Sequence, residues 1–523
     1  MQNELSASVR PVVARSNLSI GIAWQRAAMV VAVAIFVFLA VFNLTSFPTT
    51  WFDEGSHLHV PKTLVRLGAY ADYSSEGFRY YGPTIGVGPT VMLPIAAAFR
   101  LFGIGLLQAR MVMVIYLLAT VYVFYRLADV LGGQRLAWVA TALLVTSRGV
   151  ALLENGRQVL GEVPGLFFLV AGLALWFAAW EKASWKRLAS VGLLVGLAVV
   201  TKYQYLLILV PTLGLAWLAN LIYYRTTPQR VFIVPGLVAG VCFALWQVYM
   251  ILYLGPATAS ENLAALRTAT AGAAMVFSPA LMKRGLEQLL SLKVYLFLLL
   301  PALVYGFTRI LPRRRDAQQW GILFALIVVN FVWYVVASIS WLRYAFLGLA
   351  VSSLFVARFV YDLTNGFQLE LAAWRQGGAV AWKPALRLAL LAWLAVTLVV
   401  PLGQTARQII LPGANTPAMM AAYLDAHIPR GALIETWEPE MGFLTDHNYH
   451  FPPALLLNKA VGYIWLNGTP PAQSYDFVQT QHPAYVLVGA FARWVNLYPM
   501  DVLTARYQLI TRIGGYELYA FNQ

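Results

Sequence analysis

The chain has 523 residues, of which 60% are hydrophobic and only 11% are charged, and its mean hydropathy is +0.67. Soluble domains carry about 25% charged residues, so this composition excludes an ordinary soluble protein and predicts a polytopic membrane protein. The formal net charge is +15; because no basic helix suited to a nucleic-acid groove is present, we interpret this excess as the positive charge that keeps loops cytoplasmic and expect no nucleic-acid partner.

Transmembrane helices need about 20 mostly apolar residues, and about eleven segments meet this rule. The first covers residues 23–44 and follows a polar leader, 1–22; Arg10, Arg15 and Arg26 near its start predict a cytoplasmic N-terminus. The next segment, 45–105, is then an outer loop, with helices that lie along the membrane face. A second long outer loop covers residues 255–288.

The membrane domain therefore extends over residues 23–405, and an odd number of spans places the following segment outside. Residues 406–523 differ in pattern, with a predicted helix at 417–427. Short β-like runs follow at 432–436, 485–488, 508–510 and 516–521, separated by turn residues. The sequence thus predicts a mainly α, multi-pass plasma-membrane protein with a small extracytoplasmic α/β domain.

The unusual polar residues of the membrane domain all fall on the outer side of this topology. They are Asp53, Glu54, His57, His59, Arg79, Arg157, Glu162, Lys202 and Arg343. Ionisable groups at membrane helix ends are costly to desolvate and mark a functional site by default. The alternative for the Asp53-Glu54 pair is capping of a short surface helix.

Such a set of side chains suits group transfer from a phosphate carrier. A carboxylate can act as a general base, and Arg and Lys bind phosphate oxygens through charge-assisted hydrogen bonds. The sequence has no Walker motif and no Gly-rich phosphate loop. A lipid phosphate is therefore expected as the donor, since its tail can occupy the bilayer.

The order of these motifs resembles the GT-C superfamily of membrane glycosyltransferases, in the branch of the protein O-mannosyltransferases and aminoarabinose transferases. The resemblance covers residues 25–405. The matching motifs are Asp53-Glu54, Leu101-Phe102-Gly103 with Gln108-Ala109-Arg110, Arg157 to Glu162 and Pro164 running into Phe167-Phe168, Thr201-Lys202-Tyr203, and Arg343-Tyr344. The chain departs from the family where Tyr81-Gly82-Pro83 replaces a Lys-Pro-Pro-like segment, and Arg79 is the expected substitute for the missing basic residue.

The resemblance implies inverting transfer of a sugar from a polyprenyl-phosphate donor to a lipid, glycan or protein acceptor outside the cell. Asp53 would be the general base, supported by Glu54, and Glu162 would position the acceptor. The donor phosphate would be held by Lys202 and Arg343, with Arg79 and Arg157 as further candidates. His57, Tyr81 and Tyr344 are expected to line the pocket.

No cofactor is required by the sequence, although carboxylates suit Mg²⁺ or Mn²⁺ and an ion shared by Asp53 and Glu162 is an option. His57 and His59 are two residues apart and point to different helix faces, which disfavours metal binding by both. As an alternative, Lys202 and Arg343 could serve only to extend their charged ends to the lipid headgroups at the membrane surface. Other functions left open are a flippase or transporter of lipid-linked saccharides, a ligase that moves whole glycans, and a scaffold without catalysis.

Overall fold

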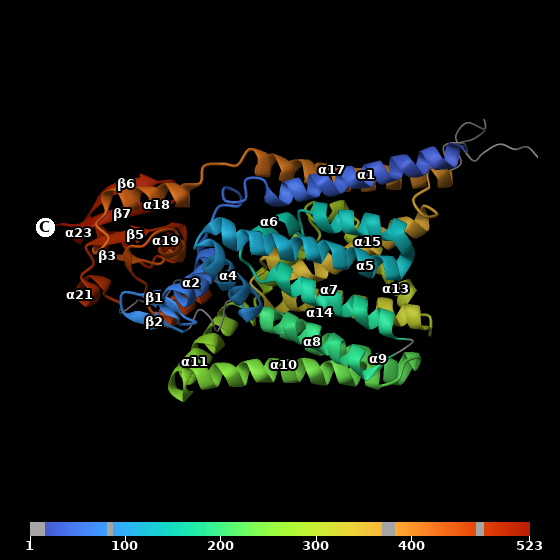
Figure 1. Ribbon diagram of the computed structural model, residues 1–523, viewed down its shortest axis with the longest axis horizontal. Coiled ribbons are helices and arrows are strands. Elements are labelled where there is room, and N and C mark those ends of the chain that lie inside the picture. Colours follow the sequence, from blue (N-terminus) through green and yellow to red (C-terminus); the bar gives the residue numbers. More distant parts are fainter. Residues whose placement is uncertain (1–15, 81–86, 181–182, 369–381, 467–474, 523) are drawn as a thin grey trace, which may run out of the picture.

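The computed structural model describes residues 16–80, 87–180, 183–368, 382–466 and 475–522. A long helical bundle and a smaller mixed α/β domain lie end to end (Figure 1). The bundle consists of α1 (Ser16–Val41), α4 (Pro89–Phe102), α5 (Leu106–Thr146), α7 (Glu162–Ala179), α8 (Trp185–Thr201), α9 (Gln204–Ala219), α10 (Arg230–Leu254), α13 (Leu299–Ile310), α14 (Arg315–Ala337), α15 (Phe346–Leu363) and α17 (Trp382–Ile410). Further elements at its ends are α6 (Leu152–Arg157), η1 (Asn220–Tyr224), α11 (Pro256–Ala273), α12 (Pro279–Leu289), η2 (Tyr295–Phe297) and η3 (Leu342–Ala345).

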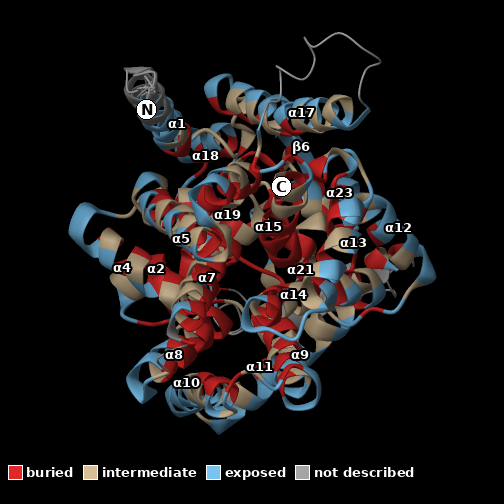
Figure 2. Cartoon of the chain, turned by 90° about the vertical axis from the view of Figure 1, so that its right-hand side faces the viewer, coloured by how far each residue is buried: buried red, intermediate tan, exposed pale blue. Residues whose placement is uncertain are grey.

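The outer helices of the bundle expose apolar side chains, as a membrane protein does toward lipid. In the most apolar window of α10 only 22% of the residues are buried, and in that of α17 only 11%. Figure 2 shows buried residues gathered along the middle of the bundle and exposed residues on the outward faces of α4, α10 and α17. Among the described residues, six helices are long and apolar enough to cross a bilayer, and four shorter apolar helices accompany them. The chain is a multi-pass membrane protein; the count of eleven spans stays a prediction.

One bend decides how the second and third predicted spans are joined. Helix α5 spans 41 residues as two helical arms that meet at a kink, where Gly133 has φ 78° and ψ 174°. A residue with a side chain rarely adopts positive φ, so glycine is required at this turn. The sequence predicts two separate apolar spans here, 106–127 and 136–153, joined by a turn at residues 129–135, and the two arms of α5 correspond to them.

After α1 in the chain, α2 (Phe52–Leu67) forms the predicted membrane-face helix. It begins eight residues earlier than expected from the sequence, at the acidic pair. It ends where Gly68 takes the left-handed conformation, with φ 75°. A hairpin of β1 (Asp72–Ser74) and β2 (Gly77–Arg79) follows, with Asp72 paired to Arg79. Helix α2 and the hairpin lie between the bundle and the C-terminal domain (Figure 1).

The C-terminal domain is built on one five-stranded mixed sheet in the order β4-β3-β5-β7-β6. Its strands are β3 (Leu433–Thr436), β4 (Asn448–His450), β5 (Tyr485–Val488), β6 (Tyr507–Ile513) and β7 (Tyr516–Phe521). Its helices are α18 (Thr416–His427), α19 (Pro439–Leu444), α20 (Ala454–Trp465), α21 (Phe477–Gln481), α22 (Ala490–Trp494) and α23 (Met500–Arg506). Strand β3 runs parallel to β4 and β5, whereas β7 is antiparallel to β5 and β6.

The predicted strands 432–436, 485–488, 508–510 and 516–521 correspond to β3, β5, β6 and β7, and the predicted helix 417–427 to α18. Strand β4 was not predicted, because Asn448, Tyr449 and His450 give only three residues and no apolar alternation. The last bundle helix, α17, continues to Ile410 and so passes the predicted boundary at 405.

Candidate active site

The acidic pair is the start of α2, where the helix dipole favours negative side chains. Neighbouring residues of an α-helix point about 100° apart, so the two carboxylates face different surroundings. Asp53 is partly accessible, with 24% of its side chain exposed, whereas Glu54 is fully buried.

Glu54 holds the bundle together. Both of its oxygens accept hydrogen bonds from Arg110 on α5, from Nε at 2.8 Å and from NH2 at 2.5 Å, and neither side chain has any exposed surface. The backbone N–H of Val159 donates to Glu54 at 3.1 Å. Arg110 also donates to the carbonyl of Leu44, at the end of the α1 segment. This bidentate pair therefore ties α2, α5, and the residues before α7 into one rigid unit.

Asp53 belongs to a second cluster, in which positive and negative groups alternate. The Arg343 guanidinium donates from NH2 to Oδ2 of Asp53 at 2.6 Å, and its Nε lies 3.4 Å from Oε1 of Glu162. Lys202 Nζ donates to the same Glu162 oxygen. The four side chains come from α2, α7, the end of α8 and η3, which are far apart in the sequence.

Local sequence explains how these groups fit. Glu162 is in the first turn of α7, and the preceding residue is Gly161, where a Cβ would lie 3.1 Å from the Lys202 side chain. The absence of a side chain there leaves room for Lys202. On the other side, the Arg343 guanidinium lies over the rings of Trp51 and Trp341, 5.2 and 5.5 Å from their centres, a geometry that favours a cation.

The cluster has unused hydrogen-bonding capacity. Within the described part of the chain, buried atoms NH1 of Arg343 and Oε2 of Glu162 have no hydrogen-bond partner, and buried polar atoms are normally paired. A cavity of about 700 Å³ reaches Arg343, with a lining that includes Trp51, Trp341, Arg284 and Lys293. Arg343 therefore borders the cavity and belongs to a cluster with an unpaired donor and an unpaired acceptor.

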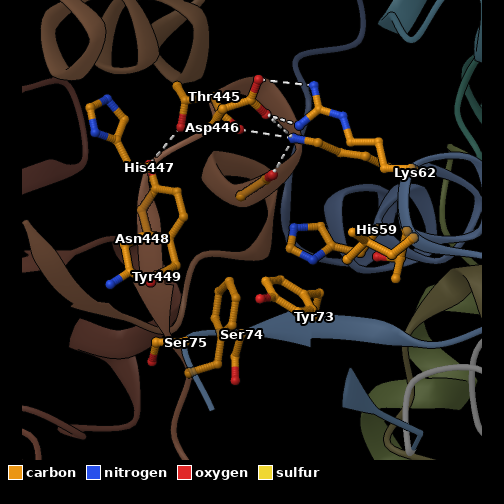
Figure 3. A pocket seen from close by; sticks show the side chains of 15 residues that line it. His59, Lys62, Tyr73, Ser74, Ser75, Thr445, Asp446, His447, Asn448 and Tyr449 are labelled. Carbon is orange, nitrogen blue, oxygen red and sulfur yellow. Dashed lines mark hydrogen bonds and ion pairs between the residues drawn. The ribbon is translucent and has the colours of Figure 1, made fainter. Parts of the chain in front are cut away.

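The C-terminal domain contacts the helix that carries Asp53. Lys62 of α2 donates from Nζ to the carbonyls of Gly442, Phe443 and Thr445 at 2.8–3.1 Å, at the C-terminal end of α19, and pairs with Asp446 at 2.9 Å. Figure 3 shows Lys62 aimed at this turn. The hydrogen bond from Arg66 and the pair with Lys62 hold the pKa of Asp446 well below its usual value.

The packing at this contact is tight. A Cβ at Gly55 would lie 2.3 Å from the backbone nitrogen of Glu440, so glycine permits the close approach of α2 and α19. Phe52 packs against Trp437 and Phe491 of the C-terminal domain, with ring centres 5.0 and 5.2 Å apart. The position of Asp53 thus depends on the C-terminal domain as well as on the bundle.

The chain is similar to known proteins in both sequence and structure. Residues 87–249 match the family model of the dolichyl-phosphate-mannose-protein mannosyltransferases. The structure is similar to ArnT from Cupriavidus metallidurans bound to undecaprenyl phosphate, with a TM-score of 0.65 and 14% identity, over 95% of this chain and 98% of that one. This chain has a PMT/ArnT-like GT-C fold.

Further comparisons extend the likeness within the GT-C fold. The apo form of the Archaeoglobus fulgidus oligosaccharyltransferase has a similar structure, with a TM-score of 0.60 at 13% identity, over 96% of this chain and 74% of that one. A search of curated protein sequences gives no match. The resemblance stated from the sequence is confirmed at the level of the fold and of the family segment, which includes Glu162 and Lys202 but not Asp53 or Arg343.

The GT-C structure brings four of the predicted site residues together, Asp53, Glu162, Lys202 and Arg343. Two predicted pocket residues lie beside them. His57 is one helical turn after Asp53, and Tyr344 follows Arg343 and stacks on Trp333. The role of each residue in catalysis stays a prediction.

Other predicted site residues lie elsewhere. Arg157 is fully buried and donates to the backbone carbonyls of Leu39, Phe42 and Phe47. It orders the connection between α1 and α2, so the expectation that it binds a phosphate was wrong. Glu54 is likewise occupied by Arg110 and does not reach the cavity; it supports Asp53 only through the backbone.

Arg79 is directed to the C-terminal domain, where its NH2 donates to the carbonyl of Pro452 at 3.1 Å and its guanidinium lies over Phe451. The structure does not place it with Lys202 and Arg343. Tyr81 lies outside the described residues. His59 is hydrogen-bonded to Asp72 at 2.5 Å, on the side of α2 that faces the C-terminal domain. Burial opposes the ionisation of Asp72, but the contact with His59 holds the pKa of Asp72 below its usual value.

Sequence reasoning missed the structural partners of the site. Arg110 was noted only as part of a motif, and its position in an apolar run could have indicated a buried ion pair with one of the two acids. Trp51 and Trp341 precede Asp53 and Arg343 closely, but aromatic residues at helix ends are common in membrane proteins and carried no specific signal.

The optional divalent ion finds little support in the donor set. The guanidinium of Arg343 lies between the carboxylates of Asp53 and Glu162, where a shared ion would bind. Among the described residues, no group of three or more His, Cys, Asp and Glu side chains could hold a metal. These residues do not fit a divalent ion, and the proposed reaction does not use one.

Proposed function

We propose that this protein is a membrane glycosyltransferase that moves a sugar from a polyprenyl-phosphate donor to an acceptor hydroxyl on the extracytoplasmic side, with inversion at the anomeric carbon. The observation that carries the proposal is the alternating cluster of Asp53, Arg343, Glu162 and Lys202. Its charges match those of the reaction, in which a proton is lost by the acceptor and negative charge grows on the departing phosphate.

Asp53 is the proposed general base. Its Oδ2 accepts from Arg343, whereas Oδ1 accepts no hydrogen bond from the described residues. This oxygen removes the proton from the acceptor hydroxyl. The acceptor oxygen attacks the anomeric carbon, and the bond between that carbon and the phosphate oxygen breaks, so that the polyprenyl phosphate leaves with the electron pair.

Arg343 and Lys202 are the proposed phosphate ligands. Positive groups fixed before the reaction stabilise charge that develops on the leaving group. The free NH1 of Arg343 is a donor in the required place. Glu162 holds both cations in position through Oε1 and leaves Oε2 to bind a hydroxyl of the sugar or acceptor.

The comparisons support a lipid-phosphate donor. ArnT was crystallised with undecaprenyl phosphate, and AglB with a dolichol-phosphate. The cell membrane and an N-terminus in the cytoplasm are part of the proposal, since they follow from the distribution of basic residues. The acceptor class, whether lipid, glycan or protein, is left to the experiment.

The test compares cell-envelope lipids, glycans and glycoproteins by mass spectrometry in a strain without the protein and in strains expressing variants. Wild type should restore a product heavier by one sugar, and Asp53→Asn should lower its formation about 10²–10⁴-fold. Glu261→Gln is the matched control, because Glu261 is an exposed carboxylate on α11.

The alternatives give different results in the same strains. A ligase would attach whole glycans, so the lost mass would correspond to an oligosaccharide. A flippase would leave Asp53→Asn cells with donor accumulated on one side of the membrane and no transfer by the purified protein. An unchanged envelope, or full activity of Asp53→Asn, would refute the proposed transferase.

A further inference from the structure

His57 shares a backbone anchor with Glu54. Nδ1 of His57 lies 2.7 Å from the carbonyl oxygen of Val159, and the N–H of the same residue donates to Glu54. Two side chains of α2, three positions apart, therefore hold one residue of the segment that leads to Glu162. This anchor fixes both the position and the rotation of the imidazole ring.

The anchor also fixes the tautomer of His57. A carbonyl oxygen can only accept, so Nδ1 carries the proton. The remaining nitrogen, Nε2, then has a free lone pair in the neutral ring. Nε2 has no hydrogen-bond partner in the described part of the chain, and His57 is only half-buried.

The surroundings keep this ring neutral. Burial lowers the pKa of His57, and Lys202 acts in the same direction; Asp53, Glu162 and the Val159 carbonyl oppose them without reversing the shift. These groups come from α2, the segment before α7, α7 itself and the end of α8. At neutral pH the site therefore contains a base besides the carboxylates.

Asp53 and His57 lie on one face of α2, since residues four apart are neighbours on a helix. Asp53 is paired with Arg343 and Glu162 with Lys202, so a proton on either carboxylate would weaken an ion pair. An uncharged imidazole can take up a proton without that loss.

We propose that His57 is the second proton acceptor of the site: Nε2 takes over the acceptor's proton from Asp53, directly or through one water molecule, and releases it to solvent. Asp53 thereby returns to the carboxylate, and His57 returns to the neutral tautomer. The inference rests on the proposed transferase reaction. No bond to carbon involves His57.

The state of the ring can be tested without a substrate. Diethyl pyrocarbonate modifies unprotonated, accessible imidazole nitrogens, and peptide mass spectrometry locates the product. We expect His57 of the intact protein in detergent to react at pH 6, where an ordinary histidine is mostly protonated. His59 is the internal control, because its Nδ1 is bonded to Asp72 and its Nε2 is buried against Gly442. Failure of His57 to react while the unfolded chain reacts would overturn the proposal.

Two amide substitutions separate anchoring from proton transfer. His57→Asn retains a donor near Nδ1 and removes Nε2, whereas His57→Gln places an amide near Nε2 and loses the anchor. Both should lower kcat at least tenfold, within the loss expected for a missing acid–base group. In wild type, kcat should fall as pH drops through the lowered pKa of His57, and this acidic limb should disappear in His57→Asn.

Chemical rescue supplies the last control. Free imidazole should raise the turnover of His57→Ala and leave that of Asp53→Asn unchanged. A His57→Asn enzyme with wild-type kcat and an unchanged acidic limb would refute the role of His57 while the transferase assignment stands. Loss of the transferase assignment itself would appear separately, as a wild-type protein that transfers no sugar.

Discussion

Asp53 and Arg343 lie 290 positions apart in the sequence and are joined by a hydrogen bond of 2.6 Å between Oδ2 and NH2. The first residue is at the start of α2, and the second is in the short helical turn before α15. Because Arg343 also lies 3.4 Å from Glu162, a single guanidinium fixes the positions of two carboxylates relative to each other. The geometry of the site thus depends on one arginine.

Replacing Arg343 should separate charge from geometry. Arg343→Lys keeps the charge but cannot reach both carboxylates, since an ammonium group has no planar fork. We expect Arg343→Gln to lower kcat about 10²–10³-fold, as for loss of one transition-state donor, and Arg343→Lys to recover only part of it. Steady-state kinetics with the product identified from the deletion strain would measure this. Equal activity of the Arg343→Lys variant and wild type would show that only the positive charge matters at this position.

The buried pair of Glu54 and Arg110 should govern stability. Arg110→Met leaves an unpaired carboxylate with no exposed surface, which costs about 3–5 kcal/mol. The double variant Glu54→Leu with Arg110→Met removes both charges and should recover much of this loss, except for the unmet N–H of Val159. Thermal unfolding in detergent of wild type, both single variants and the double variant gives the coupling. Additive losses would contradict a direct pair.

The sequence shows on which side of the membrane a residue lies, but it does not show which way a helix is rotated. Asp53, Glu162, Lys202 and Arg343 were grouped because each is at the outer end of a helix or in an outer loop once the membrane topology is drawn. The assignment of Asp53 rather than Glu54 as the base came from the family resemblance, because the residues alone do not show how α2 is rotated against α5. The burial of Arg157 was missed for a similar reason: its partners are backbone carbonyls around the end of α1, which leave no trace in side-chain patterns.

The C-terminal domain was predicted in outline because strands such as Tyr485–Val488 are apolar and bounded by turn residues. Its contact with α2 was not foreseen. Lys62 appears as one basic residue of an amphipathic helix, and only the fold brings it to the end of α19.

Lys62 should couple the C-terminal domain to catalysis. Lys62→Met removes the donor to three carbonyls and the pair with Asp446, and we expect a loss of about 3 kcal/mol or more in the docking of this domain, because each unmet buried group costs about 1–3 kcal/mol. Hydrogen exchange in residues 439–446 should rise, and transfer should fall as α2 loosens.

The control for this prediction is Arg66→Gln, on the same helix and bonded to the same Asp446. Its side chain is 45% exposed, and pairs of this kind contribute about 0.2–1 kcal/mol. Arg66→Gln should therefore leave exchange and activity near wild type. If both variants behaved alike, the backbone carbonyls would not be the partners that matter.

Two buried glutamates next to α2 should make the C-terminal domain sensitive to pH. Burial raises the pKa of Glu438 and of Glu440 above 4.5. Glu440 raises the pKa of Glu438 further, whereas the hydrogen bond with Glu438 lowers the pKa of Glu440 without reversing its shift. The O–H of Tyr516 donates to Glu440 at 2.7 Å, and the N–H of Ala492 donates to Glu438 at 3.3 Å. The folded state therefore retains protons that the unfolded chain releases.

The sign of the effect follows from this retention. The stability that these protons contribute is complete below pH 4.5, where the glutamates of the unfolded chain are still protonated. It is lost as the pH rises through the higher pKa values of the folded protein. The loss is about 1.4 kcal/mol per pH unit for one retained proton. Calorimetry of the whole protein in detergent from pH 5 to pH 8 should show the melting temperature falling. Glu440→Gln keeps an acceptor for Tyr516 and should flatten this dependence, whereas Glu287→Gln, with a carboxylate 65% exposed, should not. Parallel curves for Glu440→Gln and wild type would mean that the pair does not hold the proton in the folded protein.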